Sequence, residues 1–191
     1  HEDHVNGIYQ LLENFKVCAI AFKNPPEGYE NNEFYNITNL ANNKKIRRIE
    51  VNYMDDIDVT GINVKVITSK TNEVINSSDM LNSNSSVYLV ELDKNSSILF
   101  MGDATKETEK WILKNVINEK ANLFENVIAI QIGHHGSMTS TSEEFIKNFK
   151  DAVAIISSKK KKYGHPSSET IEILKKYNFD IVITEKEGAY S

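Results

Sequence analysis

The spacing of hydrophobic residues changes several times along the chain, and each spacing predicts a different element. Apolar residues three and four positions apart predict amphipathic helices, because they fall on one face of a helical turn. A continuous apolar run predicts a buried strand, and alternation predicts a strand with one exposed face. In the first third of the chain these patterns predict a helix over 5–14, a buried strand over 17–22, a helix over 31–43 and strands over 46–51 and 62–68.

Strands and helices then alternate to the end of the chain. An Asn- and Ser-rich stretch at 71–86 is expected to be a loop, and the next two strands are expected to form a hairpin. Thr105 is a good helix cap, and Ser140 with Glu143 forms a capping-box pattern for another helix. The strands expected here are 87–92, 97–101, 127–132, 153–157 and 180–184, and the last helix is expected over 167–177.

Composition and charge narrow the class of protein. The 191 residues can bury a core, and a net charge of −5 argues against an extended basic surface for nucleic acid. Cys18 is the single cysteine, so no disulfide forms within the chain, and no apolar run approaches the ~20 residues that span a bilayer. We expect one α/β domain over residues 1–191, and we expect it to be part of a longer protein because no initiating Met precedes its first motif.

Residues able to bind metal gather at four places in the sequence. All five histidines lie in them, although a chance scatter would leave some on helix faces or in the Asn-rich segments. Each place lies just beyond an expected strand or at the start of a helix, where α/β proteins collect ligands. We therefore expect one shared site. Its candidate members are His1, Asp3 and His4; Asp103; His134 and His135; and His165.

Imidazole and carboxylate groups suit a divalent metal site. Both are good ligands for zinc or manganese, and one carboxylate can bridge two ions. Two such ions lower the pKa of a shared water and polarise a phosphoryl or carbonyl oxygen. Gly133 and Gly136, which flank the histidine pair, are expected to let the backbone turn sharply.

Each group also has an ordinary structural explanation when it is taken alone. The first four residues fit a solvated chain start without metal, or the remainder of an expression tag. Asp103 fits a helix cap, and His165, which precedes a proline, fits a turn residue. The histidine pair fits one buried, hydrogen-bonded imidazole beside a surface neighbour. The joint pattern favours a site.

The ordered motifs resemble those of the metallo-β-lactamase fold superfamily. The first four residues resemble the end of its H-x-H-x-D-H signature, and Asp103 resembles its bridging aspartate. Nearly the whole chain is similar to one branch, which includes the metallo-hydrolase domain of ComEC-like competence (DNA-uptake) proteins and related free-standing hydrolases. The motifs that carry this similarity are Asn84-Ser85-Ser86-Val87, Gly133-His134-His135-Gly136-Ser137 and Tyr163-Gly164-His165-Pro166.

The resemblance implies a site for two divalent ions, zinc or manganese. No histidine lies between His4 and His134, so His134, or else His135, is expected to replace the first-site histidine that most members carry upstream of the bridging aspartate. Catalytic roles then fall to Asp103, His134 and His135. The metal ligands implied by position are His1, Asp3, His4, Asp103, His134 and His165.

Two further residues are candidate substrate contacts. Ser137 is expected to orient ligands or to contact a substrate oxygen. Lys162 ends the basic run 159–162, which fits a solvated loop or a segment that holds a polyanion beside the metals.

The fold that the resemblance implies is a four-layer αβ/βα sandwich, partial at the amino terminus. The first histidine of the signature would lie two positions before residue 1, and the family's amino-terminal strands are not represented. The implied function is a metal-dependent hydrolase, a phosphodiesterase or nuclease that uses a metal-bound hydroxide on a small-molecule or nucleic-acid phosphodiester. The alternatives are hydrolysis of another ester, such as phosphorylcholine, or a degenerate module that binds without catalysis.

The resemblance also implies a setting for the protein. A membrane-channel domain is expected in a longer parent chain. The implied location is bacterial, either secreted or at the cell surface, or attached to a membrane protein.

Overall fold

A computed structural model describes residues 2–25, 32–68, 73–158 and 164–188. The chain forms two compact units, residues 1–52 and 53–191. The expectation that residues 1–191 act as a single domain stays a prediction. No helix in the described ranges is long and apolar enough to cross a membrane.

The first unit pairs two helices with a small parallel sheet. Tyr9 on the first helix donates a hydrogen bond to Glu33 on the second, with Oη and Oε2 2.8 Å apart. Leu12 and Ala41 are buried, so both helices contribute to its apolar interior. The elements are α1 (Glu2–Asn14), β1 (Ala19–Phe22), α2 (Asn32–Asn43) and β2 (Arg47–Glu50).

The prediction of a buried strand over 17–22 is wrong in its burial. A strand does form, but Ala19 and Ala21 are exposed and Ile20 and Phe22 are only half-buried. Among the described residues, β1 pairs with β2 alone in a two-stranded sheet. A continuous apolar run therefore marks a strand here without marking a central one.

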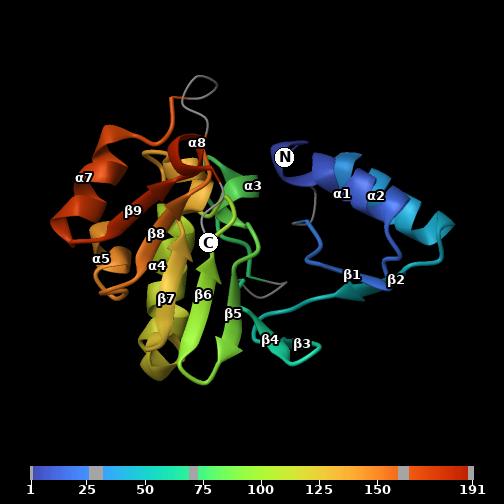
Figure 1. The fold of residues 1–191 in the computed structure, drawn as a ribbon, viewed down its shortest axis with the longest axis horizontal. Coiled ribbons are helices and arrows are strands. Elements are labelled where there is room, and N and C mark those ends of the chain that lie inside the picture. The colour runs from blue at the N-terminus through green and yellow to red at the C-terminus, as the bar shows by residue number, and fades with distance from the viewer. Residues whose placement is uncertain (1, 26–31, 69–72, 159–163, 189–191) are drawn as a thin grey trace. The chain divides into compact units, whose positions relative to one another are not determined.

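The second unit is built on a seven-stranded sheet, which Figure 1 shows side by side from β3 to β9. The strands β3 to β6 pair antiparallel, and β6 to β9 pair parallel. The mixed α/β class predicted from the sequence is confirmed. The strands are β3 (Asp56–Val59), β4 (Ile62–Val66), β5 (Tyr88–Asp93), β6 (Ser96–Phe100), β7 (Val127–Gln131), β8 (Val153–Ile156) and β9 (Asp180–Ile183).

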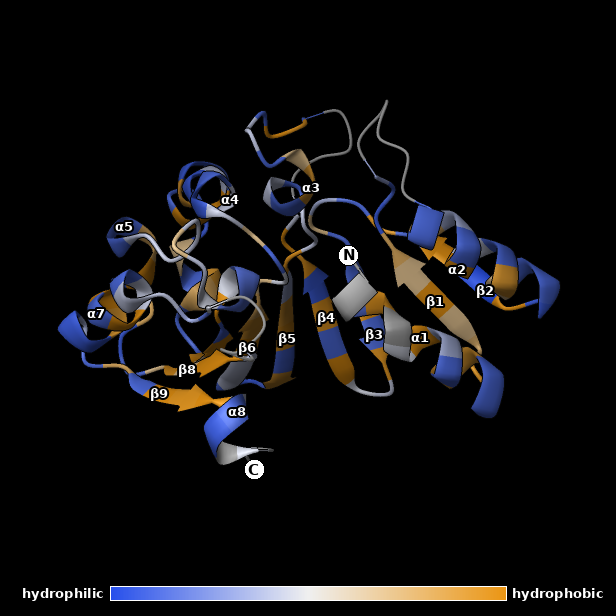
Figure 2. Cartoon of the chain, turned by 90° about the horizontal axis from the view of Figure 1, so that it is seen from above, coloured by the Kyte–Doolittle hydropathy of each residue, from blue (hydrophilic) through white to orange (hydrophobic). Residues whose placement is uncertain are grey.

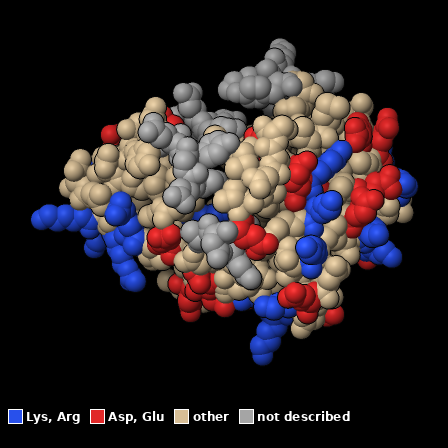
Figure 3. All heavy atoms as spheres, turned by 180° about the vertical axis from the view of Figure 1, so that it is seen from behind, with Lys and Arg blue, Asp and Glu red and all other residues tan. Residues whose placement is uncertain are grey.

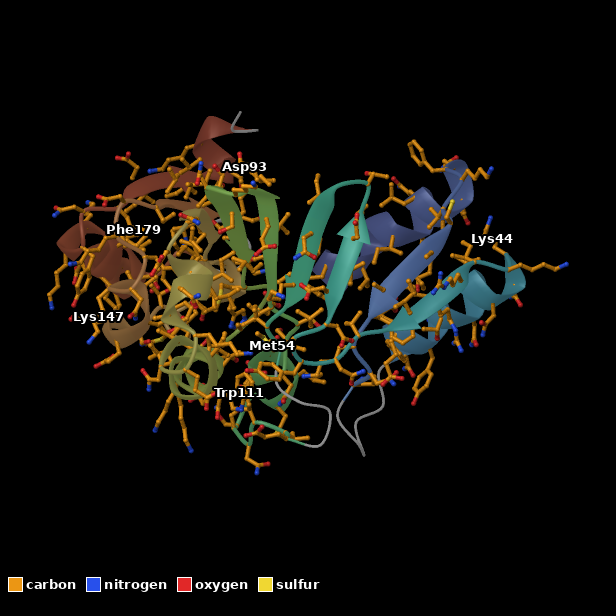
Figure 4. The ribbon with its side chains drawn as sticks, turned by 90° about the horizontal axis from the view of Figure 1, so that it is seen from below. Lys44, Met54, Asp93, Trp111, Lys147 and Phe179 are labelled. Carbon is orange, nitrogen blue, oxygen red and sulfur yellow. The ribbon has the colours of Figure 1, made fainter. Side chains whose placement is uncertain are left out.

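Helices of the second unit pack on the apolar side of this sheet. Leu89 and Leu99 point from neighbouring strands into a core that contains Trp111. Met54, labelled with Trp111 in Figure 4, packs against the same core. In Figure 2 β8 and β9 are coloured almost entirely as hydrophobic, whereas α8 after β9 is hydrophilic. The helices are α3 (Met80–Ser83), α4 (Lys106–Ile112), α5 (Glu143–Ile146), α7 (Ser168–Lys176) and α8 (Thr184–Glu187), with a π-helical turn at Leu113–Ile117 after α4.

Most predicted elements of the second unit are confirmed, including the hairpin of β5 and β6. Three details differ. The strand β3 was not predicted, and the expected loop 71–86 contains the short helix α3. Ser142, rather than Ser140, caps α5. The Ser140 hydroxyl is buried and donates to the carbonyl oxygen of Gly133, 2.7 Å away, so it ties the histidine turn to the next loop.

Candidate metal centre

Three parallel strands end beside one another at the candidate centre. Phe100, near the end of β6, is paired with Gln131 at the end of β7, and Gln131 is paired with Ile155 in β8. Because the carboxyl ends of parallel strands meet at one edge, the segments that follow them converge. Asp103 follows β6, the histidine pair follows β7, and His165 lies beyond β8.

A strained turn presents the two histidines after β7. His134 and His135 have φ values of 48° and 55°, in the left-handed region that non-glycine residues rarely adopt. Gly136 has a φ of 75°, which confirms that this glycine permits a sharp turn. Gly133 acts differently, because a Cβ at this position would lie 2.4 Å from the backbone oxygen of Ala104. The missing side chain of Gly133 lets two loops of the centre approach closely.

Asp103 and His135 lie close together after β6 and β7. His135 Nε2 lies 3.5 Å from Asp103 Oδ1, and Asp103 is only 5% exposed. His135 Nδ1 lies 2.6 Å from the backbone oxygen of Ser157. A carbonyl oxygen can only accept, so Nδ1 carries the proton and Nε2 presents its lone pair towards Asp103 in the neutral imidazole. These two ligand atoms are close enough to contact one metal ion.

His134 is oriented by a different set of contacts. Its Nδ1 lies 3.0 Å from Thr139 Oγ1, and its Nε2 lies 3.4 Å from Asn82 Nδ2. The Ser137 hydroxyl lies 3.1 Å from the same Thr139 oxygen. Ser137 is 5% exposed, and its contact with Thr139 helps to hold the loop that orients His134. Contact between Ser137 and substrate stays a prediction.

His165 completes the group of imidazoles in the second unit. Its ring centroid lies 5.9 Å from that of His134. Burial lowers the pKa of His165, the neighbouring His134 and His135 lower it further, and Asp103 opposes the shift. The neutral form that results near pH 7 is the form that binds a metal ion.

Gln131 is part of this arrangement, and its role was not foreseen from the sequence. Its Oε1 accepts hydrogen bonds from the backbone nitrogens of Met101 and Gly102, at 3.0 Å and 2.8 Å. The side chain thus fixes the turn that leads to Asp103. A glutamine at the end of an apolar strand was the available signal, because a polar side chain there needs partners of its own.

The short helix α3 supplies a second unforeseen support. Ser83 Oγ lies 2.7 Å from Thr105 Oγ1, and Thr108 Oγ1 donates to the Ser83 carbonyl oxygen at 2.7 Å. Thr108 Oγ1 also accepts from the backbone nitrogen of Thr105, at 3.2 Å. Thr105 is the N-cap of α4, as predicted, so Asp103 is not the cap of this helix.

A buried carboxylate anchors the loop beyond the histidines. Glu109 on α4 accepts backbone hydrogen bonds from Thr141 and Ser142 at 2.6 Å and 2.7 Å. Burial raises the pKa of Glu109 to about 7, although these hydrogen bonds oppose the rise. This group contributes to the support of the centre, and it was not singled out from the sequence.

The remaining predicted site residues lie in the first unit or outside the described residues. His1 and Lys162 lie outside the described residues, as does the rest of the basic run 159–162. Asp3 and His4 lie in the first turns of α1, in the first unit. Their roles as metal ligands stay predictions.

Charges elsewhere on the surface are mixed. Figure 3 shows a face on which acidic and basic side chains lie among one another. Ion pairs join Lys106 to Glu169 at 2.8 Å and Lys176 to Glu143 at 2.5 Å. Such exposed pairs contribute little to stability, and they neutralise one another locally.

Comparison with known proteins finds bacterial relatives that are much longer than this chain. No protein family model matches it. It is 25% identical over 189 residues, 98% of its length, to ComE operon protein 3 of Bacillus subtilis (strain 168), and spans 23% of that protein. It is 35% identical over 108 residues, 56% of its length, to Recombination protein 2 of Haemophilus influenzae (strain ATCC 51907 / DSM 11121 / KW20 / Rd), and spans 13% of it. The resemblance to the ComEC-like branch is confirmed.

Comparison with solved structures also finds "The crystal structure of a possible metal-dependent hydrolase from Veillonella parvula DSM 2008". The match covers 91% of this chain and 67% of that one, with a TM-score of 0.48 and 12% sequence identity.

Proposed function

We propose that the chain is a metal-dependent hydrolase of the metallo-β-lactamase superfamily, acting as a phosphodiesterase or nuclease. The observation that carries this proposal is the pairing of Asp103 with His135. His135 Nδ1 is held by a backbone oxygen, and its Nε2 lies 3.5 Å from the Asp103 carboxylate. A protein that only needed a helix cap or a surface imidazole would not require this arrangement.

The donor set fits a divalent ion. Zinc binds imidazole nitrogen and carboxylate oxygen at roughly 2.0–2.2 Å, so two ligand atoms 3.5 Å apart can contact one ion. The hydrogen bond to His135 Nδ1 is the outer support that metal-bound histidines usually have. This supports His135, rather than His134, as the partner of Asp103.

We propose that the centre would hold two divalent ions, zinc or manganese, and that Asp103 and His165 would be among their ligands. The His165 ring lies beside that of His134, with ring centroids 5.9 Å apart. When bound, divalent ions at such a centre lower the pKa of water and polarise a phosphoryl oxygen. The complete proposed set of protein ligands is His1, Asp3, His4, Asp103, His165 and one or both of His134 and His135.

The residues of the chain supply orientation. Gln131 holds the turn before Asp103, and Thr139 holds the His134 ring. We assign His134 and His135 to the catalytic surface that faces the substrate phosphate. Lys162 and Ser137 are the proposed substrate contacts, with Lys162 supplying positive charge for a phosphodiester.

One face of the seven-stranded sheet points away from the buried core, and its apolar side chains support the four-layer sandwich as the fold. Tyr88, Val90, Ile98 and Phe100 share this face by their strand pairing. These apolar side chains are half-buried or exposed, with Phe100 42% exposed, in contrast to the buried Leu99 between them. An apolar sheet face is stable when another layer covers it. We propose a second sheet layer of the same fold there, with residues 1–191 acting in one metallo-hydrolase domain.

We further propose that this domain acts in competence, on nucleic acid, as part of a longer bacterial protein with a membrane channel. The support is the similarity to ComE operon protein 3 over 98% of the chain, together with the small share of that relative that is covered. A location at the cell envelope follows from this proposal.

The test compares substrates and ions on the purified chain. With Mn²⁺ or Zn²⁺ added, we expect hydrolysis of bis-p-nitrophenyl phosphate and of plasmid DNA, and no hydrolysis of nitrocefin. Asp103→Ala should reduce turnover by roughly 10³-fold or more, because the electrostatic stabilisation of the reaction is lost. Asp180→Ala, at an exposed strand start, is the matched control and should leave turnover unchanged.

Two results would overturn the proposal. The first is turnover that persists in Asp103→Ala with the metal content unchanged. The second is fewer than one divalent ion per chain after dialysis against excess metal, which would favour the binding module.

A further inference from the structure

A second pocket, away from the candidate metal centre, lies at the opposite end of the strands in the same sheet. Its volume is about 510 Å³, within the range of small-molecule sites. The turn between β5 and β6 forms one wall, and the segment that leads into β7 forms another. Its lining residues include Gly61, Asn63, Glu91, Leu92, Ser97 and Asn126.

A buried hydroxyl without a partner lies at this pocket. Ser97 is 3% exposed, and its Oγ has no hydrogen-bond partner among the described residues. Ser97 is directly paired with Glu91, so the two side chains lie on the same face of the sheet. A buried hydroxyl left without a partner costs free energy, so its presence needs an explanation. A ligand in the pocket provides one.

The strands around Ser97 are irregular on both sides. The register between β5 and β6 shifts between Glu91 and Asp93, and the register between β6 and β7 shifts between Ser97 and Ile98. Such bulges re-aim side chains and are common beside functional sites. Here they lie at the pocket, and one of them brings Glu91, Leu92 and Asp93 to its wall.

The polar groups of the pocket offer a ligand mainly hydrogen-bond acceptors. Asn63 Nδ2 already donates to Asp56 and to Glu91 Oε2, at 3.0 Å and 2.6 Å. Asn126 Nδ2 donates to the Lys94 carbonyl oxygen at 3.1 Å. Both amide hydrogens of Asn63 and one of Asn126 are used in these bonds, and the oxygens of Asn63, Asn126 and Glu91 remain for a ligand that donates.

Charge and apolar surface define that donor more closely. Glu91 and Asp93 place two carboxylates at the pocket against the single ammonium of Lys94, and Figure 4 labels Asp93 at the end of β5. Leu92 and Leu123 add apolar walls, which a bare metal ion does not need. A cation with a short alkyl chain matches both features, because its ammonium group donates to the oxygens and its methylenes contact the leucines.

We propose that this pocket binds a small organic ligand with an alkylammonium group. The ammonium group contacts Glu91 and the Ser97 hydroxyl, and the alkyl chain lies along Leu92 and Leu123. This site is separate from the metal centre, and it does not depend on the proposed hydrolase function.

The test is isothermal titration calorimetry of the whole chain with three probes. 1,4-Diaminobutane is the cationic probe, butane-1,4-diol is its neutral counterpart, and Ca²⁺ tests for a simple metal site. We expect binding of the diamine and none of the diol or of Ca²⁺. Glu91→Gln should weaken diamine binding roughly tenfold or more, because a charge-assisted hydrogen bond becomes a neutral one. Glu144→Gln, an exposed substitution outside the pocket, is the matched control.

Ser97→Ala provides a second variant that is expected to fold normally. It removes a hydroxyl without a described partner, so thermal stability should stay the same or rise, while diamine binding weakens several-fold. Equal binding of diamine and diol would overturn the proposal, and so would Ca²⁺ binding that the diamine does not displace. Unchanged diamine binding in Ser97→Ala would also overturn it. Phosphodiester hydrolysis should be unaffected in Glu91→Gln, which separates this test from that of the metal centre.

Discussion

Two polar sites lie at opposite ends of the strands in the seven-stranded sheet, and their side chains are positioned by different means. At the candidate metal centre, backbone geometry positions the groups: His134 and His135 have positive φ, and Gly133 allows a close backbone contact. At the second pocket, side-chain hydrogen bonds such as that from Asn63 to Glu91 do so, on strands that contain bulges. The candidate metal centre should therefore be sensitive to atoms added in its backbone turns, and the second pocket should be sensitive to the charge of its side chains.

The largest expected effect comes from adding one methyl group at the candidate metal centre. Gly133→Ala places a Cβ 2.4 Å from the backbone oxygen of Ala104, a contact that the backbone has to move to relieve. We expect a loss of about 4 kcal/mol or more in the free energy of unfolding, measured by urea denaturation. Hydrolysis should fall with it, because Ala104 adjoins the proposed bridging ligand.

Gly61→Ala is the matched change at the second pocket. A Cβ there has nothing within 4 Å, but φ is 91°, which an L-residue disfavours. The expected loss is only about 1–2 kcal/mol, with hydrolysis unchanged. Equal losses for the two alanines would show that backbone contact does not distinguish the two sites.

Glu109→Ala should have the next largest effect. It removes the acceptor of the backbone nitrogens of Thr141 and Ser142, which lie in the loop beyond the histidine pair. Leaving two such donors without an acceptor should cost about 3 kcal/mol in the free energy of unfolding. Chemical denaturation at pH 6 would measure this loss, and a loss below about 1 kcal/mol would contradict the anchoring role.

The pH dependence of stability tests the protonation of the same residue. Burial raises the Glu109 pKa from the ordinary value of 4.5 to about 7, so the folded state binds the proton more tightly than the unfolded state does. Its contribution to stability is then fully present below about pH 4.5 and is lost as pH rises through 7. Between pH 5 and pH 7 this contribution should fall by about 2 kcal/mol. Glu109→Gln cannot titrate, and its stability should change less with pH over this range; an identical slope would rule out the raised pKa.

The sequence predicted that Asp103 and the histidine pair lie close together, because parallel strands constrain where their ends lie. Once the strands before Asp103 and His134 were identified, the convergence of their following turns was a matter of topology. Ligand identity was open between His134 and His135 because adjacent residues point in directions that only the turn geometry decides. That geometry depends on the positive φ of both residues, which no hydrophobic pattern encodes.

Supports and pockets were harder to predict, for a physical reason. Gln131 and Glu109 accept hydrogen bonds from backbone groups far away in sequence, so their partners cannot be read from spacing. Two of the partners of Ser83 are side-chain hydroxyls that are also distant in sequence. The strand Ala19–Phe22 was identified correctly, but its exposure depends on how many strands pair with it. The bulges beside Ser97 likewise depend on neighbouring strands and leave no pattern in one strand alone.

Gln131→Leu tests the support of the candidate metal centre by changing a side chain rather than the backbone. The backbone nitrogens of Met101 and Gly102 lose their shared acceptor, and the turn before Asp103 loses its fixed position. We expect a loss of about 2 kcal/mol in the free energy of unfolding, since both donors lie near the end of a strand where water can replace part of the contact. Turnover should fall roughly 10-fold to 100-fold, as for other outer supports of metal ligands, and metal affinity should fall with it.

The smallest expected effect is that of Asn126→Ala, which removes an equivalent amide at the second pocket. Asn126 Nδ2 donates to the Lys94 carbonyl oxygen, and this bond is exposed, so water can replace the lost donor. The free energy of unfolding should change by only about 0.5 kcal/mol, and phosphodiester hydrolysis and metal content should not change. Diamine binding should weaken, because an acceptor oxygen of the pocket is lost. A fall in turnover as large as that in Gln131→Leu would mean that the two sites are coupled, and that the sheet transmits changes at one site to the other.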